Sequence, residues 1–158
     1  MIYSLKKYIR SINDSHYNDK LIKTLQKDHQ KLFSLFIPLE EMFENEKKFK
    51  KQLEKFLKEL ELHLTLENSK LYTYLEKKYK YCDTSEISYI KTEIQNNASL
   101  FEKLLEYVNN KETEKAKETF EAIKNFLVKR IKFEEEFLYE AYLNTKKCSE
   151  IEEFLHNH

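Results

Sequence analysis

Apolar residues recur about every third or fourth position along four long stretches of this chain, a spacing typical of amphipathic α-helices. The stretches cover residues 20–43, 47–80, 85–109 and 112–143. Pro38 lies inside the first stretch and is expected to kink or split that helix. Because short connections favour antiparallel neighbours, the pattern predicts an all-α fold, an up-down-up-down antiparallel four-helix bundle.

Two shorter amphipathic segments flank this bundle, at residues 2–12 and 149–156. Both are expected to form short helices that cap it. The sequence therefore predicts an N-terminal short helix and connection over residues 1–19, the bundle over residues 20–144, and a C-terminal short helix or tail over residues 145–158.

The composition favours long helices and excludes several classes of site. The 158 residues include no glycine and one proline, whereas sheet folds rely on glycine for turns and bulges. Without glycine the chain has no Gly-rich phosphate loop and no dinucleotide fingerprint. Twenty-eight Lys and Arg balance 28 Asp and Glu, so the chain lacks the excess of positive charge that direct nucleic-acid binding requires.

The sequence also bears on location. No stretch of about 18 apolar residues is present, which excludes a membrane-spanning helix, and the N-terminal segment has no secretory signal. Cys82 and Cys148 are interpreted as single thiols, and unpaired cysteines are typical of a reducing compartment. We therefore expect a cytoplasmic protein.

Six polar residues occupy positions on the apolar stripes where leucine would be expected. They are His29, His63, Glu67, Asn97, Arg130 and Glu134. A polar group in a core costs free energy unless it is paired or bound to a metal. Six such groups at comparable depth therefore predict a polar site inside the bundle.

An internal repeat relates these positions. The aligned segments are residues 28–33 with 96–101, residues 63–67 with 130–134, and the Leu-Tyr pairs 71–72 with 138–139. Two helical hairpins of common ancestry are therefore expected to face each other, with their polar groups meeting near a pseudo-twofold axis.

A His on the first helix and His-x-x-x-Glu on the second, repeated on helices three and four, resembles the hemerythrin-like (HHE cation-binding) domains over about residues 20–143. In that family, inward His and carboxylate side chains hold a non-haem di-iron centre that binds or senses oxygen, nitric oxide or iron. The resemblance implies four metal-ligand positions: His29, His63, Glu67 and Glu134. The two glutamates match the carboxylates that bridge the irons.

Helices three and four, which would supply the second half of the di-iron site (the second half-site), depart from this pattern. Asn97 and Arg130 stand there in place of two of the family's histidines. Arg130 also brings a permanent positive charge to where the second cation would lie. Two alternatives follow: one iron or other divalent ion per chain, or no metal at all. In the second case Arg130 neutralises Glu67 and Glu134, and Asn97 and Arg130 form a structural core network in place of the lost ligands.

The run Arg130-Ile-Lys-Phe-Glu134-Glu135 is also similar to the last long helix of the bacterial regulator-of-sigma-D (Rsd/AlgQ) family, and His63 to its buried His. That resemblance implies a metal-free regulator whose protein partner is a sigma factor of RNA polymerase. No Ser-His-Asp signature is visible, and di-iron oxidase chemistry needs more ligands than this chain offers. We therefore expect a non-catalytic hemerythrin-like protein that binds or senses metal, O2, NO or a protein partner, with the sigma-factor regulator as the alternative.

Overall fold

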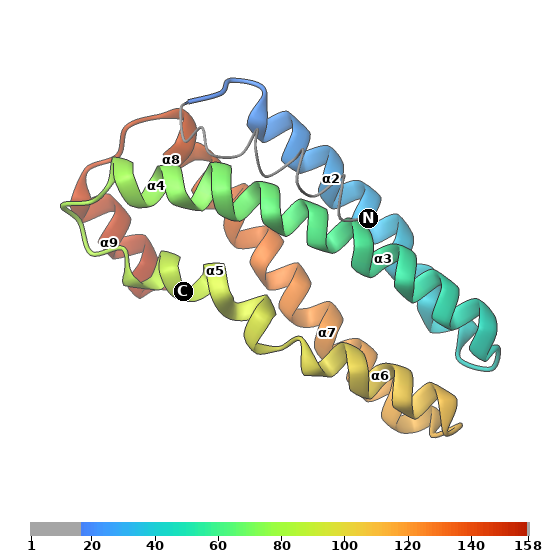
Figure 1. Ribbon diagram of the computed structural model, residues 1–158. Coiled ribbons are helices and arrows are strands. Elements are labelled where there is room, and N and C mark those ends of the chain that lie inside the picture. The colour runs from blue at the N-terminus through green and yellow to red at the C-terminus, as the bar shows by residue number, and fades with distance from the viewer. Residues whose placement is uncertain (1–16, 158) are drawn as a thin grey trace.

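The computed structural model describes residues 17–157, and all regular secondary structure in this range is helical. Two helical hairpins form the bundle (Figure 1). The first pairs α2 (Leu21–Phe36) with α3 (Glu46–Leu66), and the second pairs α6 (Ser99–Asn109) with α7 (Thr113–Phe133). The predicted all-α four-helix bundle is confirmed.

The first helical stretch ends early, at a proline. After α2 the chain tightens into the 3₁₀ segment η1 (Ile37–Met42), which has Pro38 in its first turn. Proline has no N–H for an α-helical hydrogen bond and tolerates only the first turn of a helix. The predicted split at Pro38 is therefore confirmed.

The second stretch is helical as far as Lys78 and the fourth from Thr113 to Leu143, but each contains a π-helical segment that the periodicity did not predict. Each π segment begins at a glutamate of the apolar stripe. The elements that follow α3 are η2 (Glu67–Tyr72) and α4 (Thr73–Lys78), and those that follow α7 are η3 (Glu134–Leu138) and α8 (Tyr139–Leu143). Isolated π turns are rare and often mark functional sites, which directs attention to these two glutamates.

The third stretch is two helices rather than the single one expected. The chain leaves α5 (Ser85–Asn96) at Asn97 and starts α6 two residues later. The side-chain amide of Asn97 donates a hydrogen bond to the carbonyl of Glu93 at 2.8 Å. Because asparagine competes in this way with the regular backbone hydrogen bonds, it favours a helix end at this position.

The apolar core consists of two clusters, one at each end of the bundle. Along α2, Leu25 belongs to one cluster and Leu32 to the other; along α3, Leu60 and Leu66 are divided in the same way. His29 on α2 and His63 on α3 lie between these two clusters. The polar residues are thus enclosed between two apolar layers.

The short C-terminal helix is confirmed as α9 (Cys148–His156), whereas the segment 2–12 lies outside the described residues. A disulfide joins Cys148 to Cys82, with the two Cα atoms 5.2 Å apart. The expectation of two single thiols is therefore wrong, because the fold brings together cysteines that are 66 residues apart in sequence. Within residues 17–157, no helix is long and apolar enough to cross a membrane.

Candidate metal centre

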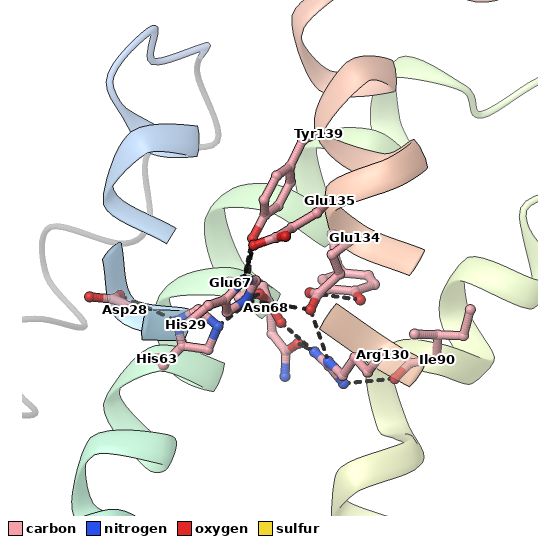
Figure 2. Close-up of polar contacts among 11 residues, drawn as sticks. Asp28, His29, His63, Glu67, Asn68, Ile90, Arg130, Glu134, Glu135 and Tyr139 are labelled. Atoms are coloured by element: carbon pink, nitrogen blue, oxygen red, sulfur yellow. Dashed lines mark hydrogen bonds and ion pairs between the residues drawn. The ribbon is translucent and has the colours of Figure 1, made fainter. Parts of the chain in front are cut away.

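Four ligand-type side chains meet between the two apolar clusters, and each comes from a different element (Figure 2). His29 lies on α2, His63 on the last turn of α3, Glu67 at the start of η2 and Glu134 at the start of η3. At most 5% of the surface of any of them is exposed. The structure thus brings together the four residues that the family resemblance implied as metal-ligand positions.

The inward-facing atoms of these residues are spaced as ligands of one ion would be. His63 Nε2 lies 2.9 Å from Glu67 Oε2, and His29 Nε2 lies 3.6 Å from that oxygen. Glu134 Oε1 lies 3.7 Å from His29 Nε2. A tetrahedral ion bound at about 2.0–2.2 Å separates its ligand atoms by about 3.4 Å. The atoms of His29, His63 and Glu67 therefore fit a single divalent cation, and Glu134 Oε1 adjoins this group through its contact with His29.

Hydrogen bonding supports this fit. Glu67 Oε2 and Glu134 Oε1 are buried and accept no hydrogen bond with acceptable geometry from the described residues. Unsatisfied buried carboxylate oxygens are costly and need an explanation. Glu67 Oε2 faces the Nε2 atoms of both His29 and His63, and Glu134 Oε1 faces that of His29. A cation bound beside these atoms would satisfy both oxygens.

The other oxygen of each glutamate is held by a protein donor. Glu67 Oε1 accepts a hydrogen bond from Arg130 Nη2 at 2.6 Å, and Glu134 Oε2 accepts one from the Tyr72 hydroxyl at 3.1 Å. A carboxylate that bridges two metal ions offers one oxygen to each. Here the outer oxygens are already paired, so the glutamates are arranged to serve one ion.

Arg130 is held rigidly on the side of the second half-site. Its Nη1 donates to the carbonyl of Ile90 at 2.8 Å, and its guanidinium lies 5.1 Å from the centre of the Tyr72 ring. Its Nε is 3.7 Å from Glu134 Oε1, an ion-pair distance without a hydrogen bond. The guanidinium is therefore hydrogen-bonded to Glu67 and ion-paired with Glu134.

Each imidazole is oriented from behind by a carboxylate on another element. His29 Nδ1 lies 3.0 Å from Glu135 Oε1, and His63 Nδ1 lies 3.2 Å from Asp28 Oδ2. A proton on Nδ1 satisfies the carboxylate and directs the Nε2 lone pair inward, an arrangement that recurs behind metal-bound histidines. The Tyr139 hydroxyl completes the pocket at 3.3 Å from His29 Nε2.

Burial and charge set the protonation of the metal-free core. Burial and the nearby Glu67 charge raise the pKa of Glu134 well above its usual range. Burial also raises the pKa of Glu67, but Arg130 and His63 outweigh this and hold it well below the ordinary value. Burial lowers the pKa of His63, whereas Glu67 and Asp28 raise it more, to about 9. A bound cation would therefore have to displace protons from His63 and Glu134.

Comparison with known protein families shows which family the chain belongs to. The chain matches the family model of the hemerythrin HHE cation binding domain over residues 20–142. The chain belongs to the hemerythrin HHE family. No curated protein and no solved structure matches it. Family membership indicates metal binding, and the cluster of His29, His63 and Glu67, whose ligand atoms lie within 4.8 Å of one another, is compatible with it.

One residue expected in this hemerythrin-like core is not there. Asn97 is half-buried at the end of α5, and its side chain is hydrogen-bonded within its own helix. The expectation that Asn97 joins the polar network is contradicted, because the break between α5 and α6 removes it from the site. Arg130 does join the network. His156, the one other described histidine, is exposed on α9, whereas His16 and His158 lie outside the described residues.

Four residues of the hemerythrin-like site were missed by the sequence interpretation: Asp28, Tyr72, Glu135 and Tyr139. The two tyrosines lie at the same repeat position, five residues after Glu67 and Glu134. This equal offset from the two glutamates could have identified both tyrosines as site residues. The two outer carboxylates gave no signal, because each contacts an imidazole from a different element rather than its own neighbour in sequence.

A small cavity of about 20 Å³ adjoins the hemerythrin-like site. Apolar residues such as Phe36, Leu60 and Leu127 form most of its lining, and the polar lining residues are His29, His63, Arg130 and Glu134. A volume of about 10–15 Å³ on this measure is needed for one water molecule. The cavity is therefore of the size of a very small molecule.

Proposed function

We propose that this hemerythrin-like protein binds one divalent metal ion, iron in the first instance, and acts by binding or sensing rather than by catalysis. The observation that supports the proposal most is the pair of unsatisfied buried oxygens, Glu67 Oε2 and Glu134 Oε1, which face two imidazole nitrogens. In the metal-free core the charge of these carboxylates is balanced by protons on His63 and Glu134, which a bound cation would replace.

The residues of this chain would have distinct tasks. His29, His63, Glu67 and Glu134 would hold the ion. Asp28 and Glu135 fix the imidazole rings, and Tyr72 fixes Glu134. When bound, the ion would supply positive charge for the two carboxylates and, if it is iron, a redox-active centre. Mixed imidazole and carboxylate ligands suit iron, manganese or zinc.

A single ion, rather than two, follows from Arg130. The guanidinium is a fixed positive charge at the outer oxygen of Glu67, where a second cation would otherwise bind. Asn97 offers no ligand to that position, because its side chain is hydrogen-bonded within α5. The second half-site of the family is thus replaced by an internal cation.

A sensing role for O2 or NO is supported by the cavity beside the imidazoles. Its volume of about 20 Å³ and its largely apolar wall suit a diatomic molecule better than a polar metabolite. The apolar clusters on both sides limit the access of water to the site. We place the sensed ligand at this cavity.

Calorimetric titration of chelator-treated protein with Fe(II) under argon, and with Mn(II) and Zn(II), tests the proposal. We expect binding by the parent chain, and a loss of at least about 100-fold in affinity in His63→Ala. His156→Ala is the matched control, since it removes an exposed histidine, and it should bind as the parent does. If none of the three ions binds to the parent, the proposal is wrong.

A metal-free regulator is the competing proposal, and the 2.6 Å bond between Arg130 and Glu67 favours it, because it already neutralises one carboxylate. In that case the partner would be a protein, with a sigma factor as the first candidate. Binding of a purified sigma factor by the chelator-treated protein, undiminished in His63→Ala, would favour this alternative. The cytoplasmic location stays a proposal, and it has to accommodate the disulfide between Cys82 and Cys148.

A further inference from the structure

The disulfide between Cys82 and Cys148 has no part in the metal centre, yet it attaches the helix α9, which packs against the segment η3 that carries Glu134. Cys82 follows α4, and Cys148 is the first residue of α9. Cys148 is exposed and Cys82 is half-buried. The bond is thus within reach of a reductant in solution. In a reducing compartment such disulfides are usually transient and serve catalysis or redox sensing.

The α9 helix contacts the segment that carries Glu134. The Phe154 ring stacks on the ring of Phe137, with 3.8 Å between centroids, and lies 5.6 Å from the ring of Phe133. Phe133 directly precedes Glu134, and Phe137 lies within η3. The face of η3 that carries Phe137 is therefore covered by α9.

The same helix also borders Arg130. Leu155 lines a cleft of about 250 Å³ together with Phe133 and Arg130. An isolated helix shorter than about 12–15 residues is marginal in water. The nine residues of α9 therefore depend on their attachment to the bundle. This attachment consists of the buried side chains of Ile151 and Leu155, the stacking of Phe154, a hydrogen bond from the Asp83 N–H to Glu152 Oε1 at 3.3 Å, and the disulfide.

We propose that the Cys82–Cys148 disulfide is a redox-active site, opened by a dithiol reductant, and that its reduction releases α9 and loosens η3. The state of the two thiols then sets the order of the segment that presents Glu134 and Glu135. Its consequence for metal binding rests on the proposed function, whereas the release itself requires no metal.

The reaction balances without a cofactor. A thiolate of the reductant attacks the exposed Cys148 sulfur, forms a mixed disulfide and releases Cys82 as a thiolate, which takes up a proton. The second thiol of the reductant then attacks its own half of the mixed disulfide and releases Cys148. Two electrons and two protons pass to the cysteines, and the reductant becomes a cyclic disulfide.

Amide hydrogen exchange on the metal-free protein, with and without dithiothreitol, tests this inference. On reduction we expect exchange over residues 148–156 and over residues 134–138 to accelerate by at least about tenfold. Exchange over α6, which belongs to the other apolar cluster, should stay the same. Because the chelated protein is used, the result is independent of whether the proposed metal binds.

Two variants serve as controls. Cys82→Ser combined with Cys148→Ser should exchange as the reduced parent does, with or without dithiothreitol. Phe154→Ala keeps the disulfide but removes the ring that stacks on Phe137, so exchange over η3 should accelerate more than exchange over α9, which the disulfide and the buried Ile151 still hold.

The inference is overturned by any of three outcomes. Unchanged exchange in α9 would make the bond dispensable, and acceleration of α9 without η3 would break the link to the metal centre. Equal acceleration everywhere, including α6, would make the bond a general stabiliser of the fold.

Discussion

At the scale of single residues, each buried glutamate has one carboxylate oxygen bonded to a protein donor and the other available to the proposed ion. Glu67 gives one oxygen to Arg130, and Glu134 gives one to Tyr72, while the remaining oxygens face the imidazoles. Arg130 therefore balances the charge of Glu67 in the metal-free core, and its own positive charge opposes the binding of a second metal ion. Its removal therefore affects stability and metal affinity in opposite directions.

The stability of the metal-free core depends on Arg130. Arg130→Leu leaves Glu67 buried without its main partner, and loss of one member of a buried ion pair costs about 3–5 kcal/mol. Urea unfolding of chelator-treated protein should show a loss of that size. Lys132→Leu, which breaks the exposed pair with Glu136 at 3.9 Å, is the control and should change stability by less than about 1 kcal/mol. Equal stability of Arg130→Leu and the parent would contradict the assignment.

Metal affinity should respond to Arg130 in the other direction. Arg130→His removes a fixed charge close to Glu134 Oε1 and restores an imidazole of the family pattern. Because like charges repel strongly at such short range, we expect Fe(II) to bind at least about tenfold more tightly than to the parent. Weaker binding, measured by the same anaerobic titration, would show that Arg130 supports the ion instead of opposing it.

The carboxylates behind the imidazoles should matter although they do not touch the ion. Glu135→Gln replaces the partner of His29 Nδ1 with an amide, and loss of such an outer partner typically costs about 10–100-fold in metal affinity. Glu136→Gln is the matched control on the next residue, which is exposed and does not contact the site. Equal Fe(II) affinities for the two variants would remove Glu135 from the site.

At the scale of the elements, the two helical hairpins are more alike in structure than their apolar stripes indicated. Both hairpins enter a π-helical segment at the equivalent glutamate, so Glu67 and Glu134 each begin a widened turn. The widened turns also contain or precede the tyrosines that contact the site, Tyr72 and Tyr139. The stripes could not show this, because one extra residue in a turn changes the apolar spacing too little to be seen.

The break between α5 and α6 is the element that distinguishes the two halves. Asn97→His restores the residue type of the family pattern, but the side chain starts at the end of α5, where Asn97 is hydrogen-bonded within its own helix. We expect Fe(II) affinity and stoichiometry to stay within about twofold of the parent. Acquisition of a second ion by this variant alone would show that α5 and α6 rejoin when Asn97 is replaced.

At the scale of the molecule, the all-α bundle and the meeting of its inward polar residues could be predicted from one sequence. The apolar period and the absence of glycine predicted long helices, and the repeat predicted that the inward polar residues of both hairpins meet, which holds for all of them except Asn97. The disulfide could not be predicted, because the proximity of Cys82 and Cys148 depends on where α9 docks. The contacts of Asp28 and Glu135 depend in the same way on tertiary packing.

The central claim is a site for one ion, with Arg130 in place of the second. Anomalous diffraction from a crystal grown with Fe(II) under argon tests it most directly. The account predicts one peak, about 2.0–2.2 Å from ligand atoms of His29, His63, Glu67 and Glu134, with Arg130 still bonded to Glu67 Oε1. Two peaks roughly 3.5–4 Å apart, with the guanidinium displaced, would contradict it, as would a crystal with no peak between the two apolar clusters.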